Sequence, residues 1–510
     1  MMLCTLYIYY MDKLILEKKN HSVLHVQSDF GIANELSDFF SFFVPGYKYM
    51  PAFRNKVWDG KIRLFNVQSN ELHVGLYPFI KDFCDKRNYK IELSDENNYG
   101  SPDETVDINP NEIMDFVKEL KIQSRGKPIA IRDYQFDAIC HALHKKRAVL
   151  VSPTGSGKSL IIYVLIKYYL AMLNSNIQKV LIIVPTTSLV DQMYSDFKDY
   201  GMEVEEGCHK IYSGKEKMTN AGTVISTWQS IYKLPAKWFE QFGCIIGDEC
   251  HGFKSKSLNS IMNKAREAEY RFGTTGTLDG TQTHELVLQG LFGKIYNVTT
   301  TKKLQDNDTL AKLLINVIVL KYSEEIRKNR GKQTYPDEID YIVRNESRNK
   351  FIRNLATTQT GNTLVLFQFV EKHGKILFDM IRDEADEERK VFYVSGETAT
   401  SDREAIRAIV ESEKNAIIVA SMGTFSTGIN IRNLHNIIFA SPSKSQIRVL
   451  QSIGRSLRKS DDGREAKLYD IADDLHWLGR KNFALEHSAE RIKIYSKQKF
   501  NYKVYEIELK

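Results

Sequence analysis

Cysteine is scarce in this chain, and long apolar runs are lacking. The six cysteines among 510 residues are Cys4, Cys84, Cys140, Cys208, Cys244 and Cys250. Their wide spacing leaves no Cys-x-x-Cys pair, which argues against a zinc site or a disulfide framework and for a reducing compartment. No apolar stretch approaches the length that spans a bilayer. We therefore expect a cytoplasmic protein that does not bind membranes.

The first ten residues lack the features of a secretion signal. Met1–Tyr10 is apolar and aromatic, but it has no basic leader and no small-residue cleavage site. We expect a strand there, with Met11 as an alternative start. The whole chain carries a formal net charge of +7, with 42% hydrophobic and 26% charged residues. This is an ordinary globular composition that permits a polyanionic partner, and the length predicts two to four domains.

The most informative stretch is Ser152–Ser159, with the sequence S-P-T-G-S-G-K-S. It follows the apolar run Ala148–Val151 and precedes a periodic apolar segment, which is the strand–loop–helix context of a phosphate-binding loop. Such loops point backbone N–H groups at phosphates. We expect ATP to bind here, with Lys158 on the β- and γ-phosphates and Ser159 on Mg²⁺. The predicted loop residues are Pro153, Thr154, Gly155, Ser156, Gly157, Lys158 and Ser159.

One departure from the general pattern is Ser152, which stands where a Gly usually begins the loop. A Ser- and Gly-rich turn that happens to end in Lys-Ser is the alternative. Just upstream, Arg132-Asp133-Tyr134-Gln135 opens a helix, and Gln135 can hydrogen-bond an adenine as donor and acceptor. A plain surface helix start would be the alternative for that segment.

A second decisive stretch is Cys244–His251, an apolar strand that ends in two acids. Asp248 is expected to hold Mg²⁺, and Glu249 to orient and deprotonate the attacking water. Adjacent acids at a strand end could instead form an exposed turn. His251 is a weaker candidate for coupling hydrolysis to motion, because a lone histidine is usually structural.

Apolar strands alternate with amphipathic helices on both sides of residue 300, which predicts parallel sheets covered on both faces. Residues 300–345 between them are interpreted as an irregular, charged segment. The second half has no phosphate loop of its own. Its Gln451, Arg455 and Arg458 share a helix face by three- and four-residue spacing. Two arginines on one face could stabilise a transferring phosphoryl group, although an ordinary basic helix face is the alternative.

The segment Gly46–Phe65 interleaves five basic residues and one acid with Tyr, Phe and Trp. Basic groups track phosphates and aromatic faces stack on bases, so Lys56, Trp58 and Lys61 are candidates for nucleic-acid binding. A hairpin with core aromatics and solvated lysines explains the composition equally well.

Taken in order, these stretches resemble the motif series of superfamily 2 helicases and translocases over roughly residues 130–460. The resemblance implies an α/β fold of two tandem RecA-like parallel-sheet lobes, with a small α+β N-terminal domain. It implies domains at 1–98 (nucleic-acid-binding), 99–128 (linker and helix), 129–300 (the ATP-binding lobe) and 301–510 (the second lobe). Gly428-Ile429-Asn430 departs from the family's usual Gly-x-Asp.

The same resemblance implies roles for individual residues. Adenine would be read by Gln135, beside Arg132, while Thr275, Thr277 and His251 would couple hydrolysis to motion. Arg455 and Arg458 would act as arginine fingers, together with Gln451. The tracked strand would be contacted by Thr186, Thr227, Ser421 and Thr424.

The whole chain also resembles the recombination and repair helicases of T-even-type phages. That resemblance implies a monomeric ATP-dependent DNA helicase that acts on branched, single-stranded and duplex DNA and on RNA in DNA–RNA hybrids. Its activities would be fork regression, Holliday-junction branch migration and R-loop unwinding. An RNA helicase and a restriction-type double-stranded DNA translocase subunit are the alternatives.

Overall fold

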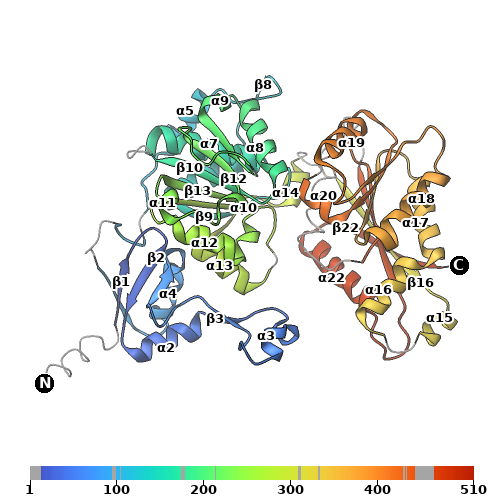
Figure 1. Cartoon of the computed structure of the whole chain (residues 1–510), viewed down its shortest axis with the longest axis horizontal. Helices are drawn as coiled ribbons and strands as arrows, with labels where there is room; N and C mark the ends of the chain where they lie inside the picture. The colour runs from blue at the N-terminus through green and yellow to red at the C-terminus, as the bar shows by residue number, and fades with distance from the viewer. Residues whose placement is uncertain are drawn as a thin grey trace. The chain divides into compact units, whose positions relative to one another are not determined.

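The structure is a computed structural model. It describes residues 13–94, 99–103, 105–173, 178–212, 214–278, 280–307, 312–330, 333–428, 431, 433–442 and 465–509. Chain contacts divide these residues into two compact units (Figure 1). One unit holds the described residues up to Ser152 together with Gly157–Val298. The other holds Pro153–Ser156 and the described residues from Thr299 onward.

The first unit begins with a small α+β domain built on a four-stranded sheet in the order β5-β2-β1-β6. Side chains of β1 alternate between partly exposed and buried, so one sheet face packs against the helices. A two-stranded ribbon, β3–β4, leaves this domain and carries the short helix α3 (Figure 1). The elements are β1 (Lys13–Lys18), β2 (Val23–Gln27), α2 (Phe30–Phe39), β3 (Ser41–Phe43), α3 (Pro51–Arg54), β4 (Lys61–Arg63), β5 (Glu71–His73), α4 (Tyr77–Asp85) and β6 (Lys90–Leu93).

The larger part of the first unit is a seven-stranded sheet in the order β11-β12-β10-β13-β14-β9-β15, with parallel neighbours throughout. Its strands are β9 (Arg147–Val151), β10 (Lys179–Val184), β11 (Cys208–Ile211), β12 (Thr223–Thr227), β13 (Phe242–Asp248), β14 (Tyr270–Thr275) and β15 (Ile295–Asn297). Strand β10 is apolar on both faces because Ile182 packs into one core and Leu181 into another. The sheet is therefore covered on both sides, as near-continuous apolar strands predict.

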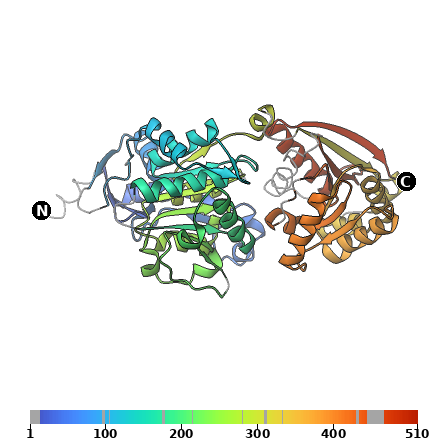
Figure 2. The ribbon, with the colours of Figure 1, turned by 90° about the horizontal axis from the view of Figure 1, so that it is seen from above.

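Helices of the first unit are shared between those two cores (Figure 2). One core is lined by α5 (Pro110–Glu119), α6 (Asp133–Lys145), α7 (Lys158–Tyr168) and α8 (Thr187–Asp199). The other is lined by α10 (Trp228–Ile231), α11 (Ala236–Phe239), α12 (Lys256–Lys264) and α13 (Gln282–Phe292). A short helix, α9 (Val204–Gly207), precedes β11. Helix α5 lies in the segment 99–128, yet Ile113 and Val117 are buried in the first core, so this helix packs with the sheet.

The small domain packs closely on the seven-stranded sheet's helices. Gly75 comes so near to α13 that a Cβ there would lie 2.0 Å from the Gln289 carbonyl oxygen. Leu286 of α13 is a member of the small domain's core, and Leu64 packs against the cores of both parts. These shared contacts make the small domain a fixed extension of the first unit.

A buried arginine closes the same seam. Arg271, at the start of β14, is 1% exposed and donates to the Ser22 hydroxyl at 2.6 Å. It also donates to the carbonyls of Met262, in the last turn of α12, and of Ala268, which follows that helix. A buried guanidinium is stable only when its donors are satisfied, so this residue ties the small domain to the sheet.

The second unit contains another seven-stranded sheet, in the order β18-β19-β17-β20-β21-β16-β22. Its strands are β16 (Leu313–Lys321), β17 (Thr363–Phe367), β18 (Val391–Val394), β19 (Ile417–Ser421), β20 (Asn436–Phe439), β21 (Ala466–Asp474) and β22 (Asn501–Glu508). Its helices are α14 (Thr301–Asp306), α15 (Glu324–Asn329), α16 (Tyr335–Arg344), α17 (Glu346–Thr358), α18 (Lys375–Glu384), α19 (Thr400–Ser412), α20 (Met422–Gly428) and α22 (Phe483–Lys497). The fold is therefore two parallel-sheet lobes with an N-terminal α+β domain, as predicted.

The interpretation of residues 300–345 as irregular is wrong. Strand β16 lies inside that segment and pairs along its length with β21 and β22. Its apolar residues, including Val317 and Leu320, are buried. The charged helices α15 and α16 on one side of this strand mask its apolar run when composition is averaged over the whole segment.

Candidate nucleotide site

The phosphate-loop sequence connects β9 to α7, the strand and helix that its motif requires. Gly155 and Gly157 have φ of +83° and +82°, a left-handed conformation in which a side chain would be strained. The Ser156 hydroxyl donates to the Pro153 carbonyl at 2.6 Å and closes the turn, while Thr154 is partly exposed. The loop is thus a tight backbone cradle at the N-terminus of an eleven-residue helix.

Three charged side chains meet beside this loop. Lys158 Nζ lies 3.0 Å from Glu249 Oε1 and 3.8 Å from Asp248 Oδ1. Both carboxylates are delivered by the end of β13, two strands away from β9 in the sheet. Residues 90 and 91 positions apart in the sequence are thereby brought together, and three of the side chains predicted to be catalytic lie beside one another.

Burial and charge act against each other in this cluster. Burial alone would lower the pKa of Lys158, but the Glu249 and Asp248 carboxylates outweigh it and raise that pKa. Burial likewise favours the neutral form of Glu249, yet Lys158 and His251 outweigh it and hold the pKa of Glu249 below its usual value. For Asp248, burial outweighs the attraction of Lys158, and its pKa is raised. The two neighbouring acids are therefore distinct, as a pair with different tasks requires.

Glu249 adopts a left-handed backbone conformation, with φ of +49°. This is uncommon for a residue with a Cβ and is concentrated at functional positions. Its Oε2 atom lies 3.3 Å from His251 Nδ1, which in turn lies 3.0 Å from the Thr275 hydroxyl. The Thr275 hydroxyl also donates to the Thr277 carbonyl, at 2.9 Å. Glu249, His251 and Thr275 thus form one connected polar group.

The Thr277 side chain takes no part in that group. Its hydroxyl is buried and has no hydrogen-bond partner within the described part of the chain. Thr274, which the sequence analysis did not single out, donates instead to Asp248 Oδ1 at 2.8 Å. The pairing of β14 with β13 places Thr274 in register with Asp248, a neighbourhood that only the folded chain reveals.

Gln135, in the first turn of α6, packs against the phosphate loop. It is 2% exposed, and its Oε1 accepts the backbone N–H of Arg132 at 3.0 Å. A Cβ on Gly157 would lie 2.3 Å from Gln135 Nε2, so Gly157 must be glycine for this reason also. The Arg132 guanidinium donates to the Tyr134 hydroxyl at 2.8 Å. Of the two residues predicted to bind adenine, Gln135 therefore lies against Gly157 of the loop, and the binding of adenine stays a prediction.

Tyr200 is a site residue that sequence reasoning missed. Its hydroxyl lies 2.9 Å from the Ser159 hydroxyl, the group predicted to reach Mg²⁺. Tyr200 follows the end of α8 and lies far from any motif. No pattern in the sequence could place it there.

The small hydroxyl residues predicted to contact a nucleic-acid strand all lie at strand ends or helix starts. In the first unit Thr186 caps α8 and accepts from Leu189 N, and the Thr227 hydroxyl lies 2.9 Å from that of Ser230. Strands β10 and β12 are paired in register, which puts Thr186 and Thr227 on one sheet edge. In the second unit the Ser421 hydroxyl donates to Thr424 Oγ1 at 2.6 Å, at the start of α20.

Gln451, Arg455, Arg458 and Asn430 lie outside the described residues, as does the strand expected at Met1–Tyr10. Among the described residues no cluster of three or more His, Cys, Asp or Glu side chains could hold a metal ion by itself. Within the same residues, no helix has the length and apolar character that crossing a membrane requires.

The candidate DNA-binding residues near Trp58 lie on the ribbon β3–β4. The Trp58 indole donates to the Lys61 carbonyl at 2.8 Å, and Lys61 Nζ stands 5.2 Å from the centre of the Phe43 ring. Lys56 is exposed and lines a pocket with Trp58. Both readings of this segment find support here, because some aromatic rings pack together while the cations face solvent.

Three family models match the chain. They are a DNA helicase UvsW N-terminal domain at residues 14–94, a type III restriction enzyme res subunit at 128–280, and a helicase conserved C-terminal domain at 346–460. All three models describe parts of helicases or of related restriction enzymes, in the order that the motif series predicts.

Individual relatives extend this match over nearly the whole chain. The ATP-dependent DNA helicase uvsW of Enterobacteria phage T4 is 38% identical over 94% of this chain and 97% of its own length. The DNA 3'-5' translocase XPB2 of Sulfurisphaera tokodaii is 26% identical over 67% and 81%. The crystal structure of T4 UvsW matches 98% of this chain and 100% of that chain, with 35% identity and a TM-score of 0.50. The chain belongs to the UvsW family of superfamily 2 helicases.

Proposed function

We propose that this chain is an ATP-dependent DNA helicase that remodels branched DNA through fork regression, branch migration of Holliday junctions and R-loop unwinding. The observation that carries the proposal is the contact of Lys158 with Glu249 and Asp248 beside a glycine cradle. A relative at 38% identity that is named an ATP-dependent DNA helicase supports the choice of ATP and DNA.

Hydrolysis begins with a competition for Lys158. Its ammonium is paired with Glu249 at 3.0 Å, and phosphates bound on the loop attract the same charge more strongly. As Lys158 turns to the phosphates, Glu249 keeps His251 as its partner. Glu249 then orients the attacking water and accepts its proton; because Lys158 lowers the pKa of Glu249, its departure to the phosphates makes the ionised carboxylate a stronger base.

Mg²⁺ fits this site although no three-ligand cluster is present among the described residues. Magnesium usually takes only one or two protein oxygens and completes its shell with water and substrate phosphates. Ser159 and Asp248 would supply those oxygens, and the ion would neutralise charge on the β- and γ-phosphates.

The connected group beyond Glu249 supplies the coupling. A change in the position of Glu249 alters the His251 and Thr275 hydrogen bonds, and Thr275 holds the Thr277 carbonyl in the following loop. Thr186, Thr227, Ser421 and Thr424 contact the backbone of the tracked strand in this proposal. Gln451, Arg455 and Arg458 help to neutralise the negative charge on the γ-phosphate, and this role comes from the sequence resemblance.

The proposal includes the wider setting. The N-terminal region binds DNA through Lys56, Trp58 and Lys61, and RNA enters as one strand of a DNA–RNA hybrid. The protein acts as a monomer in the cytoplasm of a host cell. The N-terminal model of a UvsW helicase, which matches residues 14–94, supports the assignment of that region.

A substrate panel tests the proposal. Forks, four-way junctions, R-loops and linear duplexes are unwound with and without ATP, and ATP hydrolysis is measured with single-stranded DNA, duplex DNA and RNA. The account expects ATP-dependent unwinding of the branched substrates and stimulation by DNA. Stimulation by RNA alone would make the chain an RNA helicase. Hydrolysis on duplex DNA without unwinding of any branch would make it a restriction-type translocase.

A further inference from the structure

The ribbon β3–β4 and the residues that it encloses, 41–63, form a projection from the small domain (Figure 1). None of the residues from Val44 to Asp59 is buried, so the projection adds nothing to the domain's core. It keeps a defined shape nonetheless, and an exposed yet ordered element of this kind calls for a function.

An aromatic cluster within the projection holds that shape. The Tyr47 ring stacks on Phe43 with centres 4.6 Å apart and meets Phe53 edge-on at 4.7 Å. Gly60 has φ of +83°, and a Cβ there would lie 2.3 Å from the Tyr47 ring. The Trp58 indole hydrogen bond to Lys61 closes the base of the loop. These contacts account for three aromatic rings and for Trp58.

Other apolar side chains of the projection are left in solvent. Tyr49 is 78% exposed and Val57 is 81% exposed. Both belong to the projection, and large apolar side chains left in water on one small element favour a binding surface. The cations around them, Lys48, Arg54 and Lys56, carry no salt bridge among the described residues and favour an anionic ligand.

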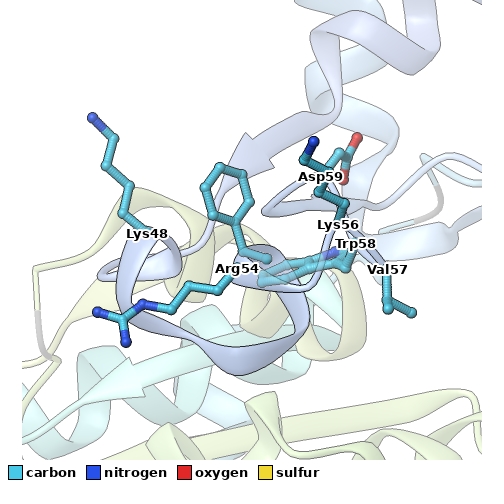
Figure 3. Close-up of a pocket in the computed structure, with 7 residues that line it drawn as sticks. Lys48, Arg54, Lys56, Val57, Trp58 and Asp59 are labelled. Carbon is cyan, nitrogen blue, oxygen red and sulfur yellow. The ribbon is translucent and has the colours of Figure 1, made fainter.

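A pocket of about 520 Å³ lies among these side chains. Phe53 and Trp58 supply aromatic lining, and Val57 stands at its exposed side (Figure 3). The long side chains of Lys48 and Arg54 extend from the other side (Figure 3). A volume of this size suits a small ligand, and rings beside cations suit a base with its phosphate.

The projection is also firmly attached to the ATP-binding lobe. Leu64, directly after β4, packs against the core that contains Phe253, three residues beyond Cys250 of the acidic strand end. The backbone N–H of Leu64 donates to the Phe40 carbonyl at 3.0 Å, which fixes the start of the ribbon as well. A displacement of the lobe therefore moves the projection with it.

We propose that the projection separates DNA strands at a branch, an inference that rests on the proposed function. Tyr49 and Val57 meet the bases at the branch point, and the pocket beside Trp58 takes the first unpaired nucleotide of the displaced strand. Lys48, Arg54 and Lys56 hold its phosphates. Stacking on an aromatic ring replaces the stacking that the base loses when its pair opens.

The test uses the full-length protein with Tyr49→Ser and Val57→Ser combined. Both side chains are exposed, so the fold should be unaffected. A control variant combines Phe30→Ser and Met218→Ser, which are 73% and 66% exposed in the same unit but lie outside the projection. Fork unwinding should fall about tenfold in the first variant, the effect of losing one base stack, and should be unchanged in the control.

A second readout separates strand opening from motor activity. ATP hydrolysis with single-stranded DNA should stay unchanged in both variants, because the nucleotide site is untouched. A fork with 2-aminopurine at its last base pair should become more fluorescent on binding the wild-type protein without ATP, and should not with the Tyr49/Val57 variant. The fluorescence reports an unstacked base whether or not hydrolysis occurs.

Two results would overturn the inference, and a third would instead reject the proposed function. Normal unwinding by the Tyr49/Val57 variant would mean that these side chains do not separate strands and would favour a protein partner for them. Equal losses of hydrolysis and unwinding would make the projection a general DNA contact or a support for the fold. A wild-type protein that opens the 2-aminopurine pair but unwinds no branched DNA with ATP would reject the proposed function, since the base capture would then serve no helicase.

Discussion

The two seven-stranded sheets of this protein have the same strand order, but their carboxylates lie in different surroundings. Counted along each unit, the strand order is third, fourth, second, fifth, sixth, first, seventh in both. In the first unit Asp248 and Glu249 lie at a strand end, where both carboxylates contact the ammonium of Lys158. In the second unit Asp470 and Asp473 lie within β21 and are fully buried against arginines.

In the second unit each of these two buried aspartates is neutralised by an arginine of the same unit. Arg348 donates to both oxygens of Asp473, at 2.7 and 3.0 Å, and the Tyr322 hydroxyl donates to Asp473 as well. Arg491 and the Tyr495 hydroxyl likewise donate hydrogen bonds to Asp470. Each carboxylate is thus neutralised within its own unit, although Arg348 Nη1 has no hydrogen-bond partner among the described residues, so these charges serve the fold. Because both sheets share one topology, we propose that the ion pairs of Lys158, together with the glycine loop, are what mark the nucleotide site.

The largest expected effect is that of Lys158→Ala. Removing the ammonium leaves the phosphates without their main cation, and we expect DNA-stimulated ATP hydrolysis to fall by about a hundredfold to a thousandfold or more. Lys198→Ala is the matched control, because Lys198 is paired with Glu205 at 2.9 Å on the surface of the same unit. Steady-state hydrolysis decides, and an active Lys158→Ala protein would break the comparison.

The next effect is on stability, from Arg348→Ala. This change leaves Asp473 buried and unpaired and should cost about 3–5 kcal/mol of unfolding free energy. Replacing both partners, as Arg348→Met with Asp473→Leu, should restore most of it, since no ligand depends on the pair. Urea unfolding measures both variants, with the exposed Arg382→Ala as control. A stable Arg348→Ala protein would show that the pair is not structural.

A shift of pH should affect both units alike. Burial, helped by Lys18 and Arg147, lowers the pKa of His21 in the first unit to about 2. Burial and then Arg348 lower the pKa of His373 in the second unit well below its ordinary value. An unfolded histidine binds a proton below about pH 6.5, and these folded ones do not. For His21, unfolding free energy therefore falls as the pH drops from 6.5 toward 2.

Thermal unfolding at pH 7.5 and 5.5 measures this shift. His21→Gln and His373→Gln should each flatten the pH dependence, because glutamine binds no proton at either pH. If the pH dependence of each variant is as steep as that of the wild-type protein, the assignment of these two groups is contradicted.

The smallest expected effect concerns Tyr200. Its hydroxyl lies 2.9 Å from that of Ser159 and competes with Mg²⁺ for it. Tyr200→Phe frees Ser159, and we expect the Mg²⁺ concentration for half-maximal hydrolysis to fall about two- to fivefold, the equivalent of one ordinary hydrogen bond. Tyr194→Phe on the same helix is the control. A higher Mg²⁺ requirement would mean that Tyr200 instead positions Ser159 for the ion.

Much of this architecture could be predicted from local patterns. Apolar runs identified β9 and β13, and a glycine loop between strand and helix identified the cradle. Strand β16 was missed because the charged helices around it dominate the composition of its segment. A nine-residue run with seven apolar positions was the better signal.

What the sequence could not supply were contacts made only by folding. The pairing of Lys158 with Glu249 and the approach of Tyr200 to Ser159 depend on which strands become neighbours. Arg271 illustrates the same limit at the domain seam. It joins β14 to Ser22, which lies 249 positions away.

The division of labour between the two acids is tested most directly by Glu249→Gln. Single-turnover hydrolysis is measured on DNA-bound protein preloaded with ATP, and ATP binding is measured on the same sample. The account predicts that ATP still binds, because Lys158 and the glycine cradle are intact, and that hydrolysis falls by at least about a hundredfold. Hydrolysis at the wild-type rate would contradict the role of Glu249 and with it the assignment of the site.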